Sequence, residues 1–232
     1  MKWQARECPI KMELVPYGSG WEDVTLDICG NHHWWSVSGC LGDGFGALVE
    51  SLYALYPHQT YDEQEANRLT GVDEFVGEYE NGEYKNLRPR TPEDSCYTTF
   101  PKSAEFYWDH EGWGVHWKLT RESGPAKEFL ITIELEESDY KGENKQSFRY
   151  EVEYADICYA VGKAITAAVK KHGFAGFHTS VWESDVNVRH LCFLKACGMG
   201  YPDDMQPFES AQRGEGATSS FDGEIELLMF DM

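Results

Sequence analysis

The stretch FYWDHEGWGVHW, which runs from Phe106 to Trp117, decides the fold of this chain. Large apolar residues occupy every second position on both sides of a central turn, at Phe106, Trp108, Trp113, Val115 and Trp117. Such alternation is typical of strands that bury one face, and the turn at Asp109–Gly112 contains the glycine that a tight reversal favours. We therefore expect a β-hairpin, with Trp117 buried and Trp113 near its tip.

The segment before this hairpin predicts three more strands. Apolar and polar residues alternate in Ile10–Val15 and in Val24–Ile28, and a third run, His32–Ser38, follows a turn at Gly30–Asn31. Strands that follow one another through such short connections favour an antiparallel meander.

Three segments have the apolar spacing of amphipathic helices. The first begins with Asp43 as its N-cap and ends before Pro57, and we expect it to lie on the meander. The second, about Tyr154–His172, repeats apolar residues four apart along one stripe and has Gly173 as its stop. The third covers Asp185–Gly198.

Two more strands complete the expected fold. Phe129–Leu135 alternates apolar with acidic residues and is the expected neighbour of the hairpin, and Glu224–Phe230 predicts a terminal strand. The polar, glycine-containing part at about 200–221 predicts a loop. We therefore expect one α+β domain over residues 1–232, with a largely antiparallel sheet and two or three helices packed on it.

Acidic residues outnumber basic residues two to one. Twenty Lys and Arg face forty Asp and Glu, which gives a formal net charge of −20. From about 61 to 103 the apolar periodicity fades while glycine, proline and acidic residues accumulate, so we interpret this part as an acidic excursion from the core. Eight of its carboxylates form the candidate partner-binding set: Asp62, Glu63, Glu65, Asp73, Glu74, Glu78, Glu80 and Glu83. The alternative interpretation is a solvated loop that serves only solubility.

Composition disfavours several classes of protein. No apolar run approaches the length that spans a bilayer, and the mixed, charged segment Met1–Ile10 differs from an export signal, so we expect a cytoplasmic protein without membrane contact. The seven cysteines are odd in number and scattered, which disfavours a disulfide framework. A polyanion would meet a negative potential, so direct nucleic-acid binding is disfavoured as well.

No motif predicts a catalytic residue, a cofactor or a metal ion. Gly42–Gly46 precedes a helix but lacks the Lys-Ser/Thr pair of a phosphate loop. His32 and His33 are adjacent in a strand and point to opposite faces, so they do not readily bind one ion. Ser36 and Ser38 lack the Gly-x-Ser-x-Gly context of a nucleophile elbow. A site built from dispersed His and carboxylates stays open, and with it a hydrolase-like enzyme.

The order of these segments resembles that of acidic bacterial immunity-type proteins linked to secreted toxins. The resemblance covers Met12–Cys197 without the acidic excursion, and four segments carry it: Leu52–Pro57, Phe106–Asp109, Gly112–Trp117 and Leu191–Ala196. It implies an α+β binding protein that needs no cofactor and neutralises a toxin by occupying it. It assigns no role to any single residue, and the acidic excursion departs from the family's pattern.

Charge and resemblance together predict an inhibitory, immunity-type protein. Its expected partner is a basic protein such as a toxin or nuclease, bound through the acidic set and through Trp113, because aromatic residues often anchor interfaces. A hydrolase-like enzyme and an adaptor component of an assembly are the alternatives.

Overall fold

A computed structural model describes eleven parts of the chain. These are residues 6–18, 20–38, 44–56, 75–80, 83–89, 103–122, 129–139, 141–181, 186–199, 221–230 and 232. The chain divides into two compact units, one formed by residues 1–58 and 101–232 and the other by residues 59–100. The second unit covers nearly the same residues as the predicted acidic excursion.

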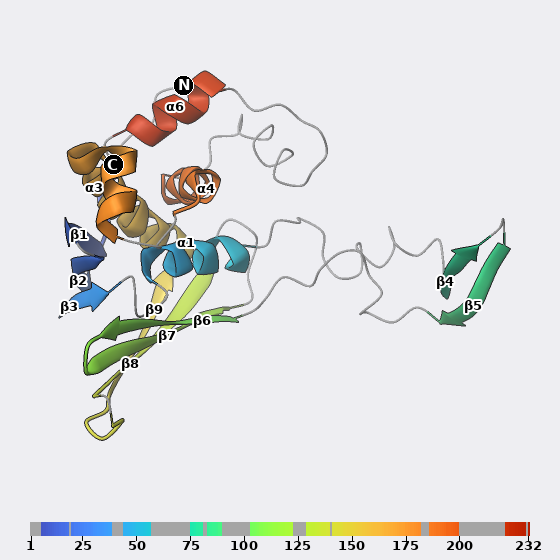
Figure 1. Cartoon of the computed structure of the whole chain (residues 1–232), viewed down its shortest axis with the longest axis horizontal. Coiled ribbons are helices and arrows are strands. Elements are labelled where there is room, and N and C mark those ends of the chain that lie inside the picture. The colour runs from blue at the N-terminus through green and yellow to red at the C-terminus, as the bar shows by residue number, and fades with distance from the viewer. Residues whose placement is uncertain are drawn as a thin grey trace. The chain divides into compact units, whose positions relative to one another are not determined.

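A seven-stranded sheet, in which every neighbouring pair is antiparallel, is the centre of the first unit (Figure 1). Its strands, in spatial order, are β1 (Lys11–Gly18), β2 (Trp21–Ile28), β3 (Asn31–Ser38), β6 (Ser103–His110), β7 (Trp113–Arg121), β8 (Leu130–Asp139) and β9 (Gln146–Glu153). The predicted meander, the hairpin and the strand after it are therefore confirmed. The α+β class with a largely antiparallel sheet is confirmed as well.

Two of the reversals are two-residue turns with positive backbone φ. Cys29 and Gly30 have φ values of 49° and 80°, and Glu111 and Gly112 have values of 33° and 113°. Positive φ at both central residues is what a type I′ turn needs to match the twist of the flanking strands. The first turn is formed by Cys29 and Gly30, one residue earlier than the predicted turn at Gly30–Asn31, because Asn31 already pairs with Ile28.

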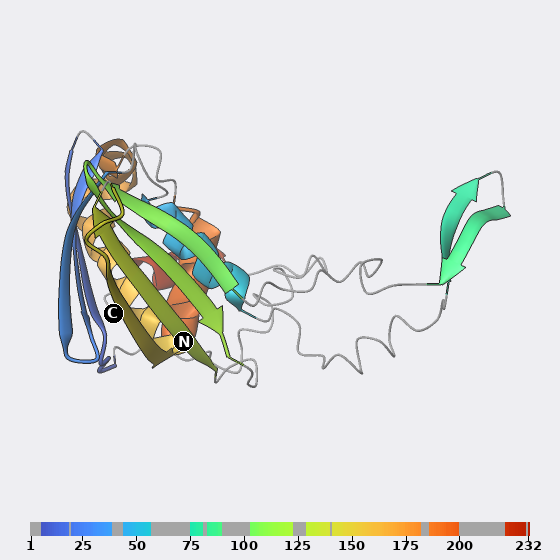
Figure 2. The same cartoon turned by 90° about the horizontal axis from the view of Figure 1, so that it is seen from below.

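The sheet has one weak connection, between β3 and β6. Among the residues that the structure describes, Ser38 and Asp109 form the only registered pair there. Toward Asn31, β3 continues past the end of the β6–β7 hairpin, whose last pair is His110 with Trp113. Figure 2 shows β1–β3 and β6–β9 as two groups of strands at an angle to each other.

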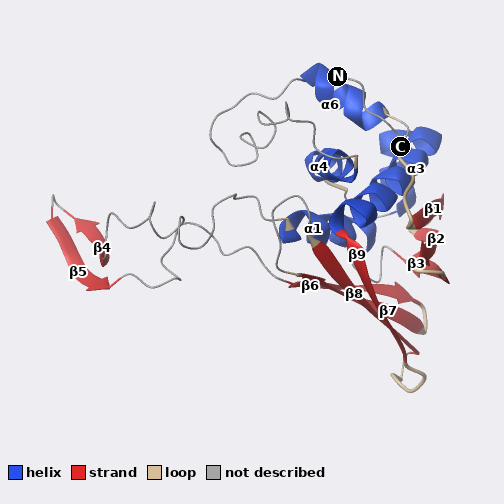
Figure 3. Ribbon diagram, turned by 180° about the vertical axis from the view of Figure 1, so that it is seen from behind, coloured by secondary structure: helices blue, strands red, loops and turns tan. Residues whose placement is uncertain are grey.

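The described helices lie on one side of this sheet (Figures 1 and 3). They are α1 (Gly44–Leu55), α3 (Tyr154–Val181), α4 (Val188–Gly198) and α6 (Phe221–Met229). Helix α3 packs mainly on β1, and α1 packs on β6 and β7. Helix α4 contacts both of these helices, and α6 packs against α4.

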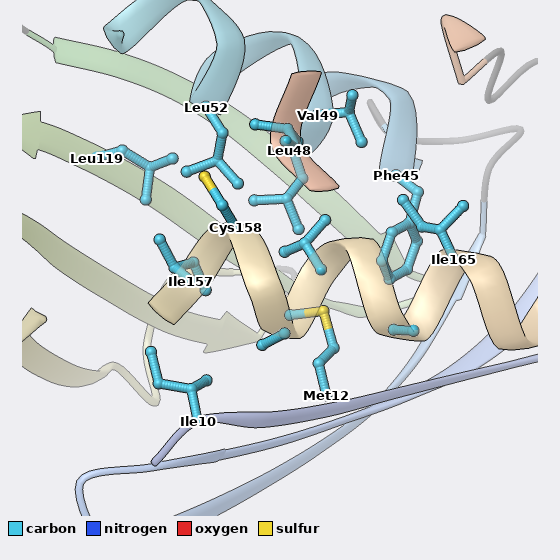
Figure 4. Close-up of a cluster of buried hydrophobic side chains, with 14 of the residues drawn as sticks. Ile10, Met12, Phe45, Leu48, Val49, Leu52, Leu119, Ile157, Cys158 and Ile165 are labelled. Carbon is cyan, nitrogen blue, oxygen red and sulfur yellow. The ribbon is translucent and has the colours of Figure 1, made fainter. Parts of the chain in front are cut away.

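One apolar core joins α1 and α3 to the inner face of the sheet (Figure 4). Its labelled side chains come from the segment before β1, from β1 and β7, and from both helices: Ile10, Met12, Leu119, Phe45, Leu48, Val49, Leu52, Ile157, Cys158 and Ile165. Fully burying a side chain of this kind stabilises a fold by about 1.5–3 kcal/mol. Trp117, which we expect to be buried, has no exposed surface.

Two helix ends can be compared with the sequence-based expectations. Gly173 has non-helical backbone angles, φ 70° and ψ 163°, and separates two helices that are together labelled α3, so the first of them stops at Gly173 as expected. The N-cap of α4 is Asn187, whose side chain accepts from the amides of Arg189 and His190. The expected caps Asp43 and Asp185 lie outside the described residues.

The predicted terminal strand at Glu224–Phe230 is wrong, because this segment is helical in α6. Leu227 is fully buried, and α6 packs on α4. Buried Lys195 of α4 donates from Nζ to the carbonyl oxygens of Leu228 and Phe230, at 3.0 Å each, and to Thr166 Oγ1 at 2.9 Å. These bonds satisfy carbonyl groups at the C-terminal end of α6, where a helix has no partners of its own.

Strand β9 was not predicted from the sequence. Tyr150 and Val152 are buried at alternate positions, so the period of two is present. The alternating pattern is short and runs directly into α3 at Tyr154. The longer helical pattern therefore dominates the sequence signal of this segment.

The second unit contains a two-stranded antiparallel sheet of β4 (Phe75–Glu80) and β5 (Glu83–Pro89). In the backbone register Glu80 pairs with Glu83 and Glu78 pairs with Lys85.

Candidate functional site

A pocket of about 250 Å³ opens in the first unit where β3 and the β6–β7 hairpin separate. Four tryptophans line it: Trp34, Trp35, Trp108 and Trp113. Two residues with polar side chains also line it, Glu137 of β8 and His110 at the end of β6, and Val37, Gly114 and Val115 are the rest of the lining. We call this feature the tryptophan pocket.

The weak connection between β3 and β6 explains why residues of both sheet faces reach the tryptophan pocket. Trp34 and Trp35 are adjacent on β3 and therefore point to opposite faces. Accordingly Trp34 is 54% exposed and Trp35 is 6% exposed. Both can line one pocket only at a place where no neighbouring strand closes the sheet beside them.

Aromatic packing fixes the inner wall of the tryptophan pocket. The ring centroids of Trp35 and Trp108 are 5.8 Å apart, and those of Trp108 and Trp117 are 4.7 Å apart. The indole Nε1 of Trp108 donates to the carbonyl oxygen of Gly44 at the start of α1. This wall is therefore tied to both the sheet and the first helix.

Glu137 is the acidic group of the tryptophan pocket. It occupies an inner-face position, because it pairs with Val115, which in turn pairs with Trp108. Its Oε1 accepts a hydrogen bond from Trp35 Nε1 at 3.0 Å and lies 3.2 Å from His33 Nδ1. A carboxylate in a partly buried position normally has such partners, since burial without them is costly.

His33 links Glu137 to Tyr150, whose hydroxyl lies 2.7 Å from His33 Nε2. Since a carboxylate only accepts, His33 Nδ1 donates to Glu137, and in the neutral imidazole Nε2 then accepts from the phenol. Burial, with smaller effects of Cys29 and Glu137, raises the pKa of Tyr150, which keeps its proton on the phenol. Three strands separate β3 from β9 in the sheet, so this contact shows how strongly the sheet curves.

One polar atom beside the tryptophan pocket has no hydrogen-bond partner. His110 Nδ1 is buried, and among the residues that the structure describes no group bonds to it. Most buried polar atoms in proteins are paired, so such an atom calls for a specific explanation.

Of the residues predicted to bind a partner, Trp113 is placed at the tryptophan pocket and is 43% exposed. Glu78, Glu80 and Glu83 lie on β4 and β5 in the second unit. The remaining members of the acidic set, Asp62, Glu63, Glu65, Asp73 and Glu74, lie outside the described residues. Their proposed role stays a prediction.

Sequence reasoning did not identify Glu137, His33 or Trp35 as site residues. One signal was available for Glu137. Along β8 the apolar residues Ile131, Ile133 and Leu135 hold the inner positions, and Glu137 continues the same alternation with a charged side chain. A charge on an apolar face is a sign of a buried polar contact.

The outer face of β6–β9 carries paired charges. Glu105, Lys118, Glu134 and Arg149 are consecutive partners across the four strands. Arg149 Nη1 lies 2.6 Å from Glu134 Oε1, and Lys118 Nζ lies 3.6 Å from Glu105 Oε1. Because acidic and basic groups alternate, this row offers no net negative field to a basic partner.

A second His–carboxylate pair lies between α1 and α4, where His190 Nδ1 is 2.6 Å from Glu50 Oε1. The other ring nitrogen, Nε2, is 3.1 Å from Arg189 Nη2. Guanidinium only donates, so Nε2 is an acceptor and Nδ1 donates to Glu50. A catalytic base would turn this nitrogen toward a nucleophile, and here an arginine occupies that direction.

Three further findings concern metal binding, membrane spans and similarity to known proteins. Within the described residues, no group of three or more His, Cys, Asp or Glu side chains is arranged to hold a metal ion. None of the helices that the structure describes is long and apolar enough to cross a membrane. Comparison of the chain with protein-family models, with curated proteins and with solved structures gave no match. The resemblance to immunity-type proteins therefore stays a prediction.

Proposed function

We propose that this chain is a cytoplasmic, inhibitory binding protein of the immunity type, which binds a basic protein and covers that protein's functional surface. The observation that carries the proposal is the tryptophan pocket, where half-exposed Trp34 and Trp113 stand beside the carboxylate of Glu137. Tryptophan is among the residue types that most often dominate binding energy at protein interfaces.

The charge of the chain supports a basic partner. A net charge of −20 attracts a cationic protein over distances longer than a direct contact. On the outer face of β6–β9, the row of Glu105, Lys118, Glu134 and Arg149 is balanced by ion pairs. We propose the acidic set between Asp62 and Glu83 as the main source of this attraction, because eight carboxylates are concentrated there. Attraction of this kind mainly accelerates association, while close packing of aromatic side chains slows dissociation.

A capture experiment followed by kinetics tests the proposal. The full chain is immobilised, an extract of the native host is passed over it at low ionic strength, and the retained proteins are identified. We expect one basic protein to be retained, and the purified chain to inhibit that protein's activity. With the partner in hand, the variant Glu74→Lys/Glu78→Lys/Glu80→Lys should associate at least about tenfold more slowly than the natural chain.

Two variants separate a specific interface from unspecific adhesion. Trp34→Ala/Trp113→Ala should lose the partner mainly through faster dissociation. Ile225→Ala and Val188→Ala remove apolar side chains that are similarly exposed on α6 and α4, and both should bind normally. Equal retention by all variants, or a partner whose activity is unaffected by the chain, would contradict the proposal.

A further inference from the structure

The tryptophan pocket has the size of a single side chain. Its volume of about 250 Å³ lies below the roughly 300–1,000 Å³ of pockets that enclose drug-sized molecules. Its opening is bordered by Trp34 and Trp113, which line it and are also about half exposed. An occupant that reaches in from a partner's surface therefore fits better than a nucleotide or another large ligand.

The charge inside the tryptophan pocket requires a cationic occupant. Trp35 and His33 both bond to Oε1 of Glu137, and no described residue bonds to Oε2. The side chain of Glu137 is 20% exposed, so the carboxylate is reachable although its orientation is fixed. A carboxylate held in place by two donors is prepared to accept further hydrogen bonds from a ligand.

His110 also lines the pocket, and its buried Nδ1 has no hydrogen-bond partner among the described residues. The lining is therefore polar at two places, but only the carboxylate of Glu137 is shown to be reachable. An occupant that bonds to this carboxylate must carry N–H donors. A quaternary ammonium group has none, whereas a guanidinium group has five in a fixed plane.

The surrounding rings favour the same group. Trp35 lies at 72° to Trp108, so the wall presents indole surfaces in two directions. Tryptophan is the best aromatic partner for a cation, and arginine provides that cation more often than lysine. A planar guanidinium can stack on one ring while its edge bonds to the carboxylate.

From these four features we infer that the tryptophan pocket receives one arginine side chain of the basic partner, with the guanidinium bonded to Glu137. The inference rests on the proposed function, because the arginine belongs to the protein that this chain binds. Glu137 is then the residue that determines specificity for arginine, and Trp35 and His33 are positioning residues that fix its carboxylate.

Small probes test the pocket without the partner. N-acetyl-arginine methylamide is titrated into the full chain and compared with N-acetyl-citrulline methylamide, which has nearly the same shape and no charge. The readout is the NMR signal of the Trp35 indole N–H, assigned with Trp35→Phe, because this proton is bonded to Glu137. We expect saturable binding of the arginine probe in the millimolar range and at least about tenfold weaker binding of the citrulline probe.

Two variants complete the test. Glu137→Gln keeps a side-chain oxygen for Trp35 and His33 but removes the charge, and it should weaken arginine binding at least about tenfold. Trp113→Ala, at a half-exposed position, should weaken it about threefold or more while the chain stays folded by circular dichroism. If Glu137→Gln does not fold, the arginine titration of Trp113→Ala alone decides whether the probe binds in the tryptophan pocket.

The inference is overturned if the arginine probe does not saturate the Trp35 signal, if citrulline binds equally well, or if a folded variant binds arginine as the natural chain does. Partner capture separates these outcomes from the function itself. A partner retained equally by the natural chain and by folded Glu137→Gln would overturn the arginine site and leave the binding function standing.

Discussion

His33 Nδ1 lies 3.2 Å from Glu137 Oε1, although 104 residues separate the two in the chain. One comes from the first meander and the other from the strand after the hairpin, so their contact closes the curved sheet at its inner face. This contact holds the carboxylate of Glu137 in place at the tryptophan pocket.

Replacing His33 with leucine should destabilise the fold. The change leaves the phenol of Tyr150 and one side of Glu137 without a partner, which we expect to lower the free energy of unfolding by about 1–3 kcal/mol. Urea unfolding measures this. The matched control is His32→Leu at the neighbouring, exposed position. It removes only a solvent-exposed contact with Asp27, so we expect a change within about 0.5 kcal/mol. Similar losses for both variants would mean that the contact contributes nothing specific.

Glu22 should make stability depend on pH. Its side chain is buried on the inner face between Pro16 and Val37, and neither carboxylate oxygen has a hydrogen-bond partner among the residues that the structure describes. Burial raises its pKa to about 8 from an ordinary value of 4.5. The folded state thus holds a proton that the unfolded chain releases. The stability contributed by Glu22 is complete below pH 4.5 and is lost as the pH rises through 8.

The variant Glu22→Gln tests this dependence. Between these two pH values the natural chain should lose up to about 1.4 kcal/mol of unfolding free energy per pH unit through this group. Glu22→Gln lacks that loss, so it should match the natural chain at pH 4 and exceed its stability at pH 9. The midpoint of denaturant-induced unfolding, measured for both proteins between pH 4 and pH 9, tests this expectation. Parallel pH profiles for the two proteins would contradict the assignment.

Lys195 should hold α6 on α4. In Lys195→Met the apolar stem keeps its length, but the carbonyl oxygens of Leu228 and Phe230 lose their donor, at a cost of about 1–3 kcal/mol. In the variant, the backbone amides of α6 should exchange hydrogen faster than in the natural chain, and those of the sheet should change less. Lys171→Met, on the exposed surface of α3, is the control and should leave the exchange of α6 unchanged.

Gly198 should tolerate no side chain. A Cβ atom there would lie 2.6 Å from the backbone N and Cα of Tyr159, so Gly198→Ala must push α3 and α4 apart, at a cost of about 1–3 kcal/mol. At Gly176 the nearest atom to an added Cβ is 3.6 Å away, and alanine should stabilise the helix by about 0.5–1 kcal/mol. Thermal unfolding of the two variants should therefore shift in opposite directions. A shift in the same direction would argue against close helix contact at Gly198.

Most of the sheet could be predicted from the sequence, because alternation is a local property. The run from Phe106 to Trp117 contains its own period and its own turn, and the run from Val24 to Ile28 leads directly into the turn at Cys29 and Gly30. Alternation was misleading at Ile225 and Leu227, where packing against α4 and bonds from Lys195 favour a helix. In β9 the same alternation is short, and the far longer helical pattern directly after it dominates the local sequence signal.

The tryptophan pocket could be predicted only in part. Trp113 was a candidate because aromatic residues at a hairpin tip often bind partners. The roles of Trp35 and Glu137 depend on the curvature of the sheet, which brings residues about one hundred positions apart into contact. No local pattern contains that curvature, although a glutamate on the apolar face of β8 was a visible signal.

The single pair of Ser38 and Asp109 has a consequence for the order in which the chain folds. Every other neighbouring pair in the sheet joins strands that follow directly in sequence, so those hairpins can form early and independently. The seam between β3 and β6 must bring together residues 71 positions apart, which carries a larger entropic cost of loop closure. We expect the two groups of strands to assemble first and to dock late, with the pocket as the last part of the molecule to acquire its final form.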